Sequence, residues 1–268
     1  MSATPTPLTT PLTTDPTLQP PIQRAATGGA GVWAWRIAGV GFVALLVIAG
    51  TFAVLTQFFV REQRTSDTYT DPVTTLSVTT GEGRIHVVSS GSYGDPTRVV
   101  ITRHSAFRLT RVSQEQVGRE LTVQGRCTGL WPFSDPCRVD VDVLLPRGAK
   151  LVLRSDTGEV MVTGVDGDVD AYTSTGAVRL AGVTSRIVTA RADTGAVVLQ
   201  FAAPPTRVVA SADTGAVLVT VPADGTEYAV KTRSDVGPAR VRVPVDPTSG
   251  HKIDATTSDG PIVVQTGS

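Results

Sequence analysis

The sequence predicts an all-β protein: a parallel β-solenoid of about 18–23 residues per coil, with an irregular β layer before it and one transmembrane α-helix ahead of both. Two observations indicate the solenoid. A turn centred on glycine recurs at nearly constant spacing, and apolar residues occupy alternate positions on both sides of that glycine. A third observation, a run of 24 residues without a charge, indicates the helix.

The first segment, residues 1–32, is rich in threonine and proline. Its first 30 residues hold eight Thr and six Pro, and their only charged side chains are Asp15 and Arg24. Such a composition offers too few apolar groups for a core, so we expect a disordered tail. The alternative is a Thr-Pro segment that is phosphorylated or docks a partner, because a phosphate would add charge where almost none exists.

The second segment, residues 33–60, is predicted to be the transmembrane helix. Its uncharged part, residues 37–60, would be about 36 Å long as a helix, enough for a hydrocarbon core of about 30 Å. Trp33, Trp35, Phe58 and Phe59 lie near its ends, as interfacial anchors do. A cleaved signal peptide is the alternative, but its apolar region is usually shorter and ends at small residues. We therefore expect a single-pass anchor, followed by a juxtamembrane linker over residues 61–69.

The two cysteines indicate which side of the membrane the remainder occupies. Basic residues are balanced on the two sides of the helix, so they do not decide the topology. Cys127 and Cys137 are the only cysteines, and such a lone close pair favours a disulfide in an oxidising exterior. Two free thiols are the alternative. We expect a cytoplasmic tail at the cell membrane and an extracytoplasmic part over residues 61–268.

The ectodomain, residues 70–268, carries the repeat. Positions two and four after each turn glycine, and five and seven before it, are mostly Val, Leu, Ile or Ala, which places each pair on one face of a strand. Each period would contain two short strands that cannot bury their apolar faces alone, so successive coils must stack. The turn glycines are Gly158, Gly176, Gly195, Gly215, Gly237 and Gly260, with an earlier copy at Gly83.

The repeat is lost between Gly83 and Gly158. Alternating, strand-like runs occur there, and we expect them to form an irregular β layer that leads into the solenoid and caps it. These runs are Arg98–Arg103, Phe107–Val112, Glu120–Gln124 and Arg138–Leu145.

The stretch over residues 139–183 resembles the bacterial putative-adhesin domain family. The matching features are a strand that ends in Leu-Pro-Arg-Gly, a Ser-Asp-Thr-Gly turn, and Gly-Asp-Val-Asp ahead of the next Thr-Gly turn. The resemblance extends over about residues 70–268. It implies a β-solenoid fold and attachment at the cell surface, and it carries over no catalytic residue.

The composition excludes several kinds of chemistry. Lys+Arg and Asp+Glu both number 24, so there is no basic surplus for nucleic acid, and two Cys with three His are too few for a zinc site. Asp-Thr-Gly occurs at Asp156, Asp193 and Asp213, as in aspartic proteases, but a turn with a capping Asp and a permissive Gly explains every copy. We expect no enzyme, no cofactor, and neither catalytic residues nor metal ligands. Calcium at the Asp-Gly-Asp-Val-Asp run, or along the column of turn aspartates, is the alternative left open.

Two features are candidates for an interaction surface. The first is the loop between the cysteines, whose Trp131 and Phe133 either cap the solenoid or present an apolar contact. The second is the column of outward-facing residues three positions past each turn glycine, in which Val198 and Leu218 are apolar. The irregular layer covering this column is the alternative. The column consists of Met161, Arg179, Val198, Leu218, Arg240 and Val263.

Together these features predict a membrane-anchored cell-envelope protein that presents a β-solenoid for adhesion, scaffolding or surface interaction. Its expected partners are the lipid bilayer and an unknown envelope or surface component. The alternative is a signalling component, in which the ectodomain senses an envelope ligand and the Thr-Pro tail reports it by phosphorylation.

Overall fold

The computed structural model describes residues 39–51, 61–105, 109–128 and 137–267. The chain divides into two compact units, Met1–Ala53 and Val54–Ser268. In the first unit, residues 39–51 form a helix with exposed side chains. No helix within the described residues is long and apolar enough to cross a membrane. The rest of the predicted span over residues 33–60, and the predicted tail over residues 1–32, lie outside the described residues.

The second unit consists of β-strands in two sheets, as the sequence predicted for an all-β chain. Sheet A has ten strands in the order β1-β4-β7-β3-β9-β11-β13-β15-β19-β17, and sheet B has nine in the order β16-β18-β14-β12-β10-β8-β2-β6-β5. The strands are β1 (Arg61–Tyr69), β2 (Thr75–Glu82), β3 (Ile85–Ser89), β4 (Thr97–Ser105), β5 (Leu109–Val117), β6 (Glu120–Thr128), β7 (Cys137–Leu145), β8 (Lys150–Thr157), β9 (Val160–Thr163), β10 (Val169–Thr175), β11 (Val178–Val183), β12 (Ile187–Thr194), β13 (Val197–Phe201), β14 (Arg207–Thr214), β15 (Val217–Val221), β16 (Ala229–Val236), β17 (Ala239–Arg242), β18 (Lys252–Asp259) and β19 (Ile262–Thr266).

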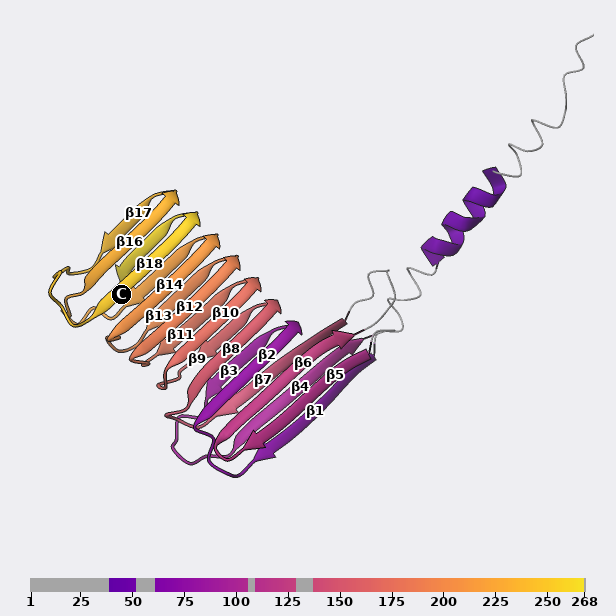
Figure 1. Cartoon of the computed structure of the whole chain (residues 1–268), viewed down its shortest axis with the longest axis horizontal. Coiled ribbons are helices and arrows are strands. Elements are labelled where there is room, and N and C mark those ends of the chain that lie inside the picture. Colours follow the sequence, from indigo (N-terminus) through magenta and orange to yellow (C-terminus); the bar gives the residue numbers. More distant parts are fainter. Residues whose placement is uncertain (1–38, 52–60, 106–108, 129–136, 268) are drawn as a thin grey trace, which may run out of the picture. The chain divides into compact units, whose positions relative to one another are not determined.

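Each repeat forms one coil with a strand in each sheet. The strand before the turn glycine belongs to sheet B and the strand after it to sheet A, and equivalent strands of neighbouring coils pair in parallel (Figure 1). The registers join equivalent positions: Val169 pairs with Val188 in sheet B, and Val178 with Val197 in sheet A. The predicted strand pairs and their inward positions are therefore confirmed over residues 150–221.

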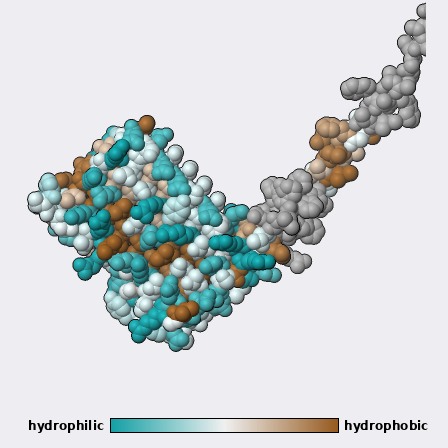
Figure 2. Space-filling view, in the orientation of Figure 1, coloured by the Kyte–Doolittle hydropathy of each residue, from teal (hydrophilic) through white to brown (hydrophobic). Residues whose placement is uncertain are grey.

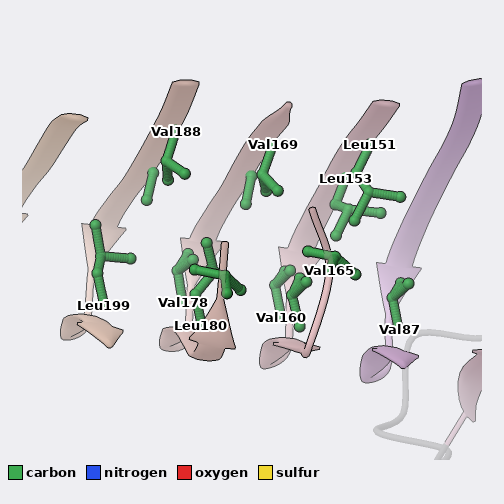
Figure 3. Close-up of a cluster of buried hydrophobic side chains, with 14 of the residues drawn as sticks. Val87, Leu151, Leu153, Val160, Val165, Val169, Val178, Leu180, Val188 and Leu199 are labelled. Carbon is green, nitrogen blue, oxygen red and sulfur yellow. The ribbon is translucent and has the colours of Figure 1, made fainter. Parts of the chain in front are cut away.

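The core lies between the two sheets and runs along the stack. Leu151 and Leu153 from sheet B face Val160 from sheet A, and two coils further along Val188 faces Leu199; these side chains are completely buried (Figure 3). Because strand residues alternate between two faces, the β-branched and aliphatic residues at every second position all enter this core. Truncating a buried leucine such as Leu199 to alanine would cost about 2–5 kcal/mol of folding free energy.

The turn glycines are required for two reasons. The φ of Gly195 is +140°, a conformation that L side chains rarely adopt, as the turn prediction expected. In addition, a Cβ at Gly195 would overlap the backbone carbonyl of Gly176 in the neighbouring coil. The coils approach so closely at this edge of the stack that a side chain cannot be accommodated.

The prediction that successive coils stack is wrong for the last two repeats. The coil β18–β19 pairs directly with β14 and β15, and the earlier coil β16–β17 lies outside it at the end of the stack. The burial of the two coils explains this order. Ala255 and Ile262 of β18–β19 are completely buried, whereas the more polar Thr232 and the smaller Ala239 occupy the equivalent positions of β16–β17. The more apolar coil takes the interior position, where more of its surface leaves water.

The irregular layer is found at the other end of the stack, and it is more regular than the sequence indicated. Strands β6 and β7 pair in parallel with β2 and β3, so they form a further coil. Only β1, β4 and β5 join the sheets by antiparallel pairing. Residues 61–69, expected to be a linker, form β1, which pairs with β4 along its whole length.

Candidate functional site

The outward column on sheet A is assembled as the sequence predicted, with a change of order at the end. Met161, Arg179, Val198 and Leu218 pair in that sequence, and Leu218 then pairs with Val263. All except Arg179 are half-buried, because each is shielded by its neighbours along the stack. Arg240 follows Val263 on the outermost strand. We call Met161, Arg179, Val198, Leu218 and Val263 the sheet A row.

Among the described residues, no strand of the irregular layer lies over the sheet A row. Strands β4 and β7 extend sheet A edge to edge, and β5 extends sheet B, so none of them lies over the row. On the face of the stack that Figure 2 shows, hydrophobic residues form short bands between hydrophilic ones. The one charged member of the row, Arg179, is paired with Glu159 of the preceding coil. The row is therefore mainly apolar, and Glu159 neutralises the positive charge of Arg179.

The outer face of sheet B is polar instead. Arg154 donates two hydrogen bonds to the Asp170 carboxylate, at 3.2 and 3.0 Å, and its guanidinium lies 6.0 Å from the centre of the Tyr172 ring. Tyr172 donates a hydrogen bond of 2.6 Å to Asp193. This hydrogen bond, together with burial, raises the pKa of the Tyr172 phenol. The two sheets thus present different chemistry to the outside.

The turn aspartates form a row, as the stacking prediction required. Register places Asp193 beside Asp213 on neighbouring strands of sheet B, and the Tyr172 hydroxyl relieves part of their repulsion.

The run that resembled a calcium loop is used differently. Asp166 accepts hydrogen bonds from the Gly148 amide at 2.7 Å and the Tyr93 hydroxyl at 3.2 Å, so it ties two turns together. No group of three or more His, Cys, Asp or Glu side chains that could hold a metal ion occurs among the described residues.

The cysteine prediction is confirmed: Cys127 and Cys137 form a disulfide. It joins the end of β6 to the start of β7, which is the place where other coils carry their turn glycine. This coil therefore replaces a tight turn with a longer loop closed by a covalent bond. Trp131 and Phe133, the predicted contacts of that loop, lie outside the described residues.

A charged cleft of about 480 Å³ lies beside the disulfide, and the sequence analysis missed it. Asp140, one of the lining residues, is buried, accepts a hydrogen bond of 2.8 Å from the Arg84 amide, and lies 3.7 Å from His104 Nε2. A signal was present in the sequence, because the turn glycine is followed by alanine in three coils but by Arg84 and Glu159 in the two coils that line the cleft. The lining residues are Glu82, Gly83, Arg84, Cys137, Arg138, Asp140, Thr157, Gly158 and Glu159.

The cleft combines acidic and basic groups. Its carboxylates are Glu82, Asp140 and Glu159, and Asp140 and Glu159 both contact neighbouring basic side chains or amides. Contacts of this kind hold the turns of adjacent coils together. The structure brings the predicted surface residues Val198 and Leu218 into one row. The disulfide-bonded Cys127 and Cys137 lie near the end of the stack that β1 and β5 form.

No family model matches the sequence, and no curated protein matches it. Solved structures that are similar to this chain include a putative cell adhesion protein from Clostridium sporogenes. The two chains are 9% identical, the match covers 78% of this chain and 100% of the other, and the TM-score is 0.45. A putative adhesin from Bacteroides fragilis is 12% identical over 76% of this chain and 97% of the other, with a TM-score of 0.40.

Proposed function

We propose that this chain is a single-pass, membrane-anchored cell-envelope protein that presents a β-solenoid for adhesion, scaffolding or surface interaction. The observation that carries the proposal is the sheet A row. Its apolar side chains lie in register across neighbouring strands, on a face that no other described strand covers. Contiguous apolar residues on an outer face are typical of protein interaction sites.

Two further features support the membrane-anchored arrangement. The uncharged run over residues 37–60 is long enough for a hydrocarbon core, and residues 39–51 of that run are helical. The disulfide between Cys127 and Cys137 suits an oxidising compartment, so we place residues 61–268 outside the cytoplasm. Labelling intact cells with an impermeant amine reagent tests this topology. Lys150, Lys231 and Lys252 are exposed and are the only lysines, so they would be labelled without cell lysis.

The interaction role is tested by crosslinking on intact cells with Leu218→Asp. Leu218 is half-buried on the outer face of β15, so we expect the variant to fold and to lose its crosslinked partners. Val209→Asp is the matched control, because Val209 is half-buried on the outer face of β14, in the same coil but on sheet B. Equal crosslinking by the wild type and Leu218→Asp, with both folded, would refute the role of the sheet A row.

A further inference from the structure

The two ends of the stack are finished differently. At the end where the chain enters, the outermost strands are β1 in sheet A and β5 in sheet B. Gln114 of β5 accepts a hydrogen bond of 3.1 Å from the Tyr69 hydroxyl and donates one of 2.6 Å to Asp67, both on β1. These polar contacts bridge the two sheets and close the core at this end.

The opposite end is open. Its outermost strands are β16 and β17, and no other strand of the described residues pairs with their outer edges. Val241 of β17 is 40% exposed, whereas Val264, which occupies the equivalent position in the neighbouring coil, is completely buried. Val236 and Val245 at the same end are 63% and 51% exposed. We call β16, β17, Val236 and Val245 the open end.

Of the two open edges, β16 is the one suited to pairing. It has eight residues and no proline, whereas β17 has four and lies between Pro238 and Pro244. An edge strand presents unpaired amides and carbonyls that can accept another strand. Its outward face carries Lys231, Arg233 and Asp235, all exposed.

We propose that the open end binds the open end of a second copy of this chain, with the two β16 strands antiparallel about a two-fold axis. Charge complementarity selects this partner and its register. When the axis passes through Ser234, Arg233 of each copy lies opposite Asp235 of the other, which gives two favourable cross-strand pairs. An axis through Thr232 would instead place Lys231 opposite Arg233, and the two positive charges would repel each other.

The charged side chains are available for this exchange. Arg233 Nε and Asp235 Oδ1 lie 3.3 Å apart within the same strand, and the two side chains are 77% and 56% exposed. A pair this exposed contributes little to the stability of one copy, so re-pairing across the interface costs little. Association also covers the exposed valines of both copies, which adds an apolar contribution. The pairing goes beyond the proposed function and does not depend on the membrane anchor.

Sedimentation velocity of the full chain in detergent micelles tests the proposal through a charge exchange. Arg233→Asp and Asp235→Arg each place like charges across the interface, and each should raise the dimer Kd about 5- to 30-fold. The double variant R233D/D235R restores opposite charges in a symmetric pair, so it should return the Kd to within about threefold of the wild type. Arg111→Asp, a charge reversal on the edge strand β5 at the closed end, is the matched control and should leave the Kd unchanged.

Three outcomes would overturn the proposal. A wild-type chain that is monomeric at about 100 μM would exclude the second copy as the occupant, as would single variants that associate like the wild type. If the double variant dimerises as weakly as the single variants, the two β16 strands do not pair in this register, and any strand bound at the open end belongs to a different protein. Far-UV circular dichroism of each variant shows that the sheets remain folded, which is expected because all the substituted side chains are exposed.

Discussion

Replacing Gly195 with alanine tests why the coils need glycine at their turns. Gly195 has φ +140°, and a Cβ there would overlap the backbone carbonyl of Gly176. Gly164 also has a positive φ, +67°, but no atom lies within 4 Å of the position that its Cβ would take. The two substitutions therefore separate the cost of backbone conformation from the cost of close stacking.

The expected magnitudes follow from these two terms. At Gly164, alanine meets only the left-handed backbone conformation, which costs about 1–2 kcal/mol. At Gly195 the backbone strain costs about 1–3 kcal/mol, and the overlap must also separate two coils. Separation weakens the hydrogen bonds that join these two coils, from the Gly176 amide to Thr194 and from the Val178 amide to Ala196, at 2.9 and 3.0 Å. Each contributes about 1 kcal/mol net, so we expect a total of about 3–5 kcal/mol.

Urea denaturation followed by far-UV circular dichroism measures both effects. We expect Gly195→Ala to lower the free energy of unfolding by about 1–4 kcal/mol more than Gly164→Ala does. The slope of the free energy with urea should stay the same, since both variants start from the same folded stack. Equal losses in the two variants would refute the claim that close approach between coils, beyond the sign of φ, requires glycine at this turn.

Three further predictions address the disulfide, a buried tyrosine and the core. Because the disulfide closes a loop with a sequence separation of 10, replacing Cys127 and Cys137 with serine should lower the free energy of unfolding by about 2–3 kcal/mol, as measured in urea. Burial, followed by the nearby Asp224, raises the pKa of the Tyr228 phenol to about 12, above its ordinary value near 10. The folded state therefore resists deprotonation, so stability should fall as the pH rises from about 10 through about 12. Tyr228→Phe should flatten that fall, and an unchanged pH profile in this variant would contradict the assignment. Leu199→Ala should lower the melting temperature through a loss of about 2–5 kcal/mol, whereas the exposed Gln200→Ala should stay within about 0.5 kcal/mol of the wild type.

The predicted surface was recovered in part. Val198 and Leu218 could be placed on one face because strand residues alternate, and their equal distance of three residues from the turn glycine then puts them in register. The charged cleft was not anticipated because it depends on which coils lie together at the disulfide end. Arg84 and Glu159 are far apart in the sequence, and they meet only because β3 pairs with β9.

The sequence by itself determined, over residues 150–221, which residues enter strands, which side chains face the core and where the turns need glycine, and it favoured the pairing of the two cysteines. These are properties of one coil, and they follow from the period of two in a strand and from the conformational freedom of glycine. The order of the coils was decided only by the tertiary structure. Every coil offers its neighbours the same parallel array of backbone amides and carbonyls. The local sequence around Ile253 or Val241 therefore does not show which coil is internal. The total apolar area removed from water decides it, and that area depends on all coils together.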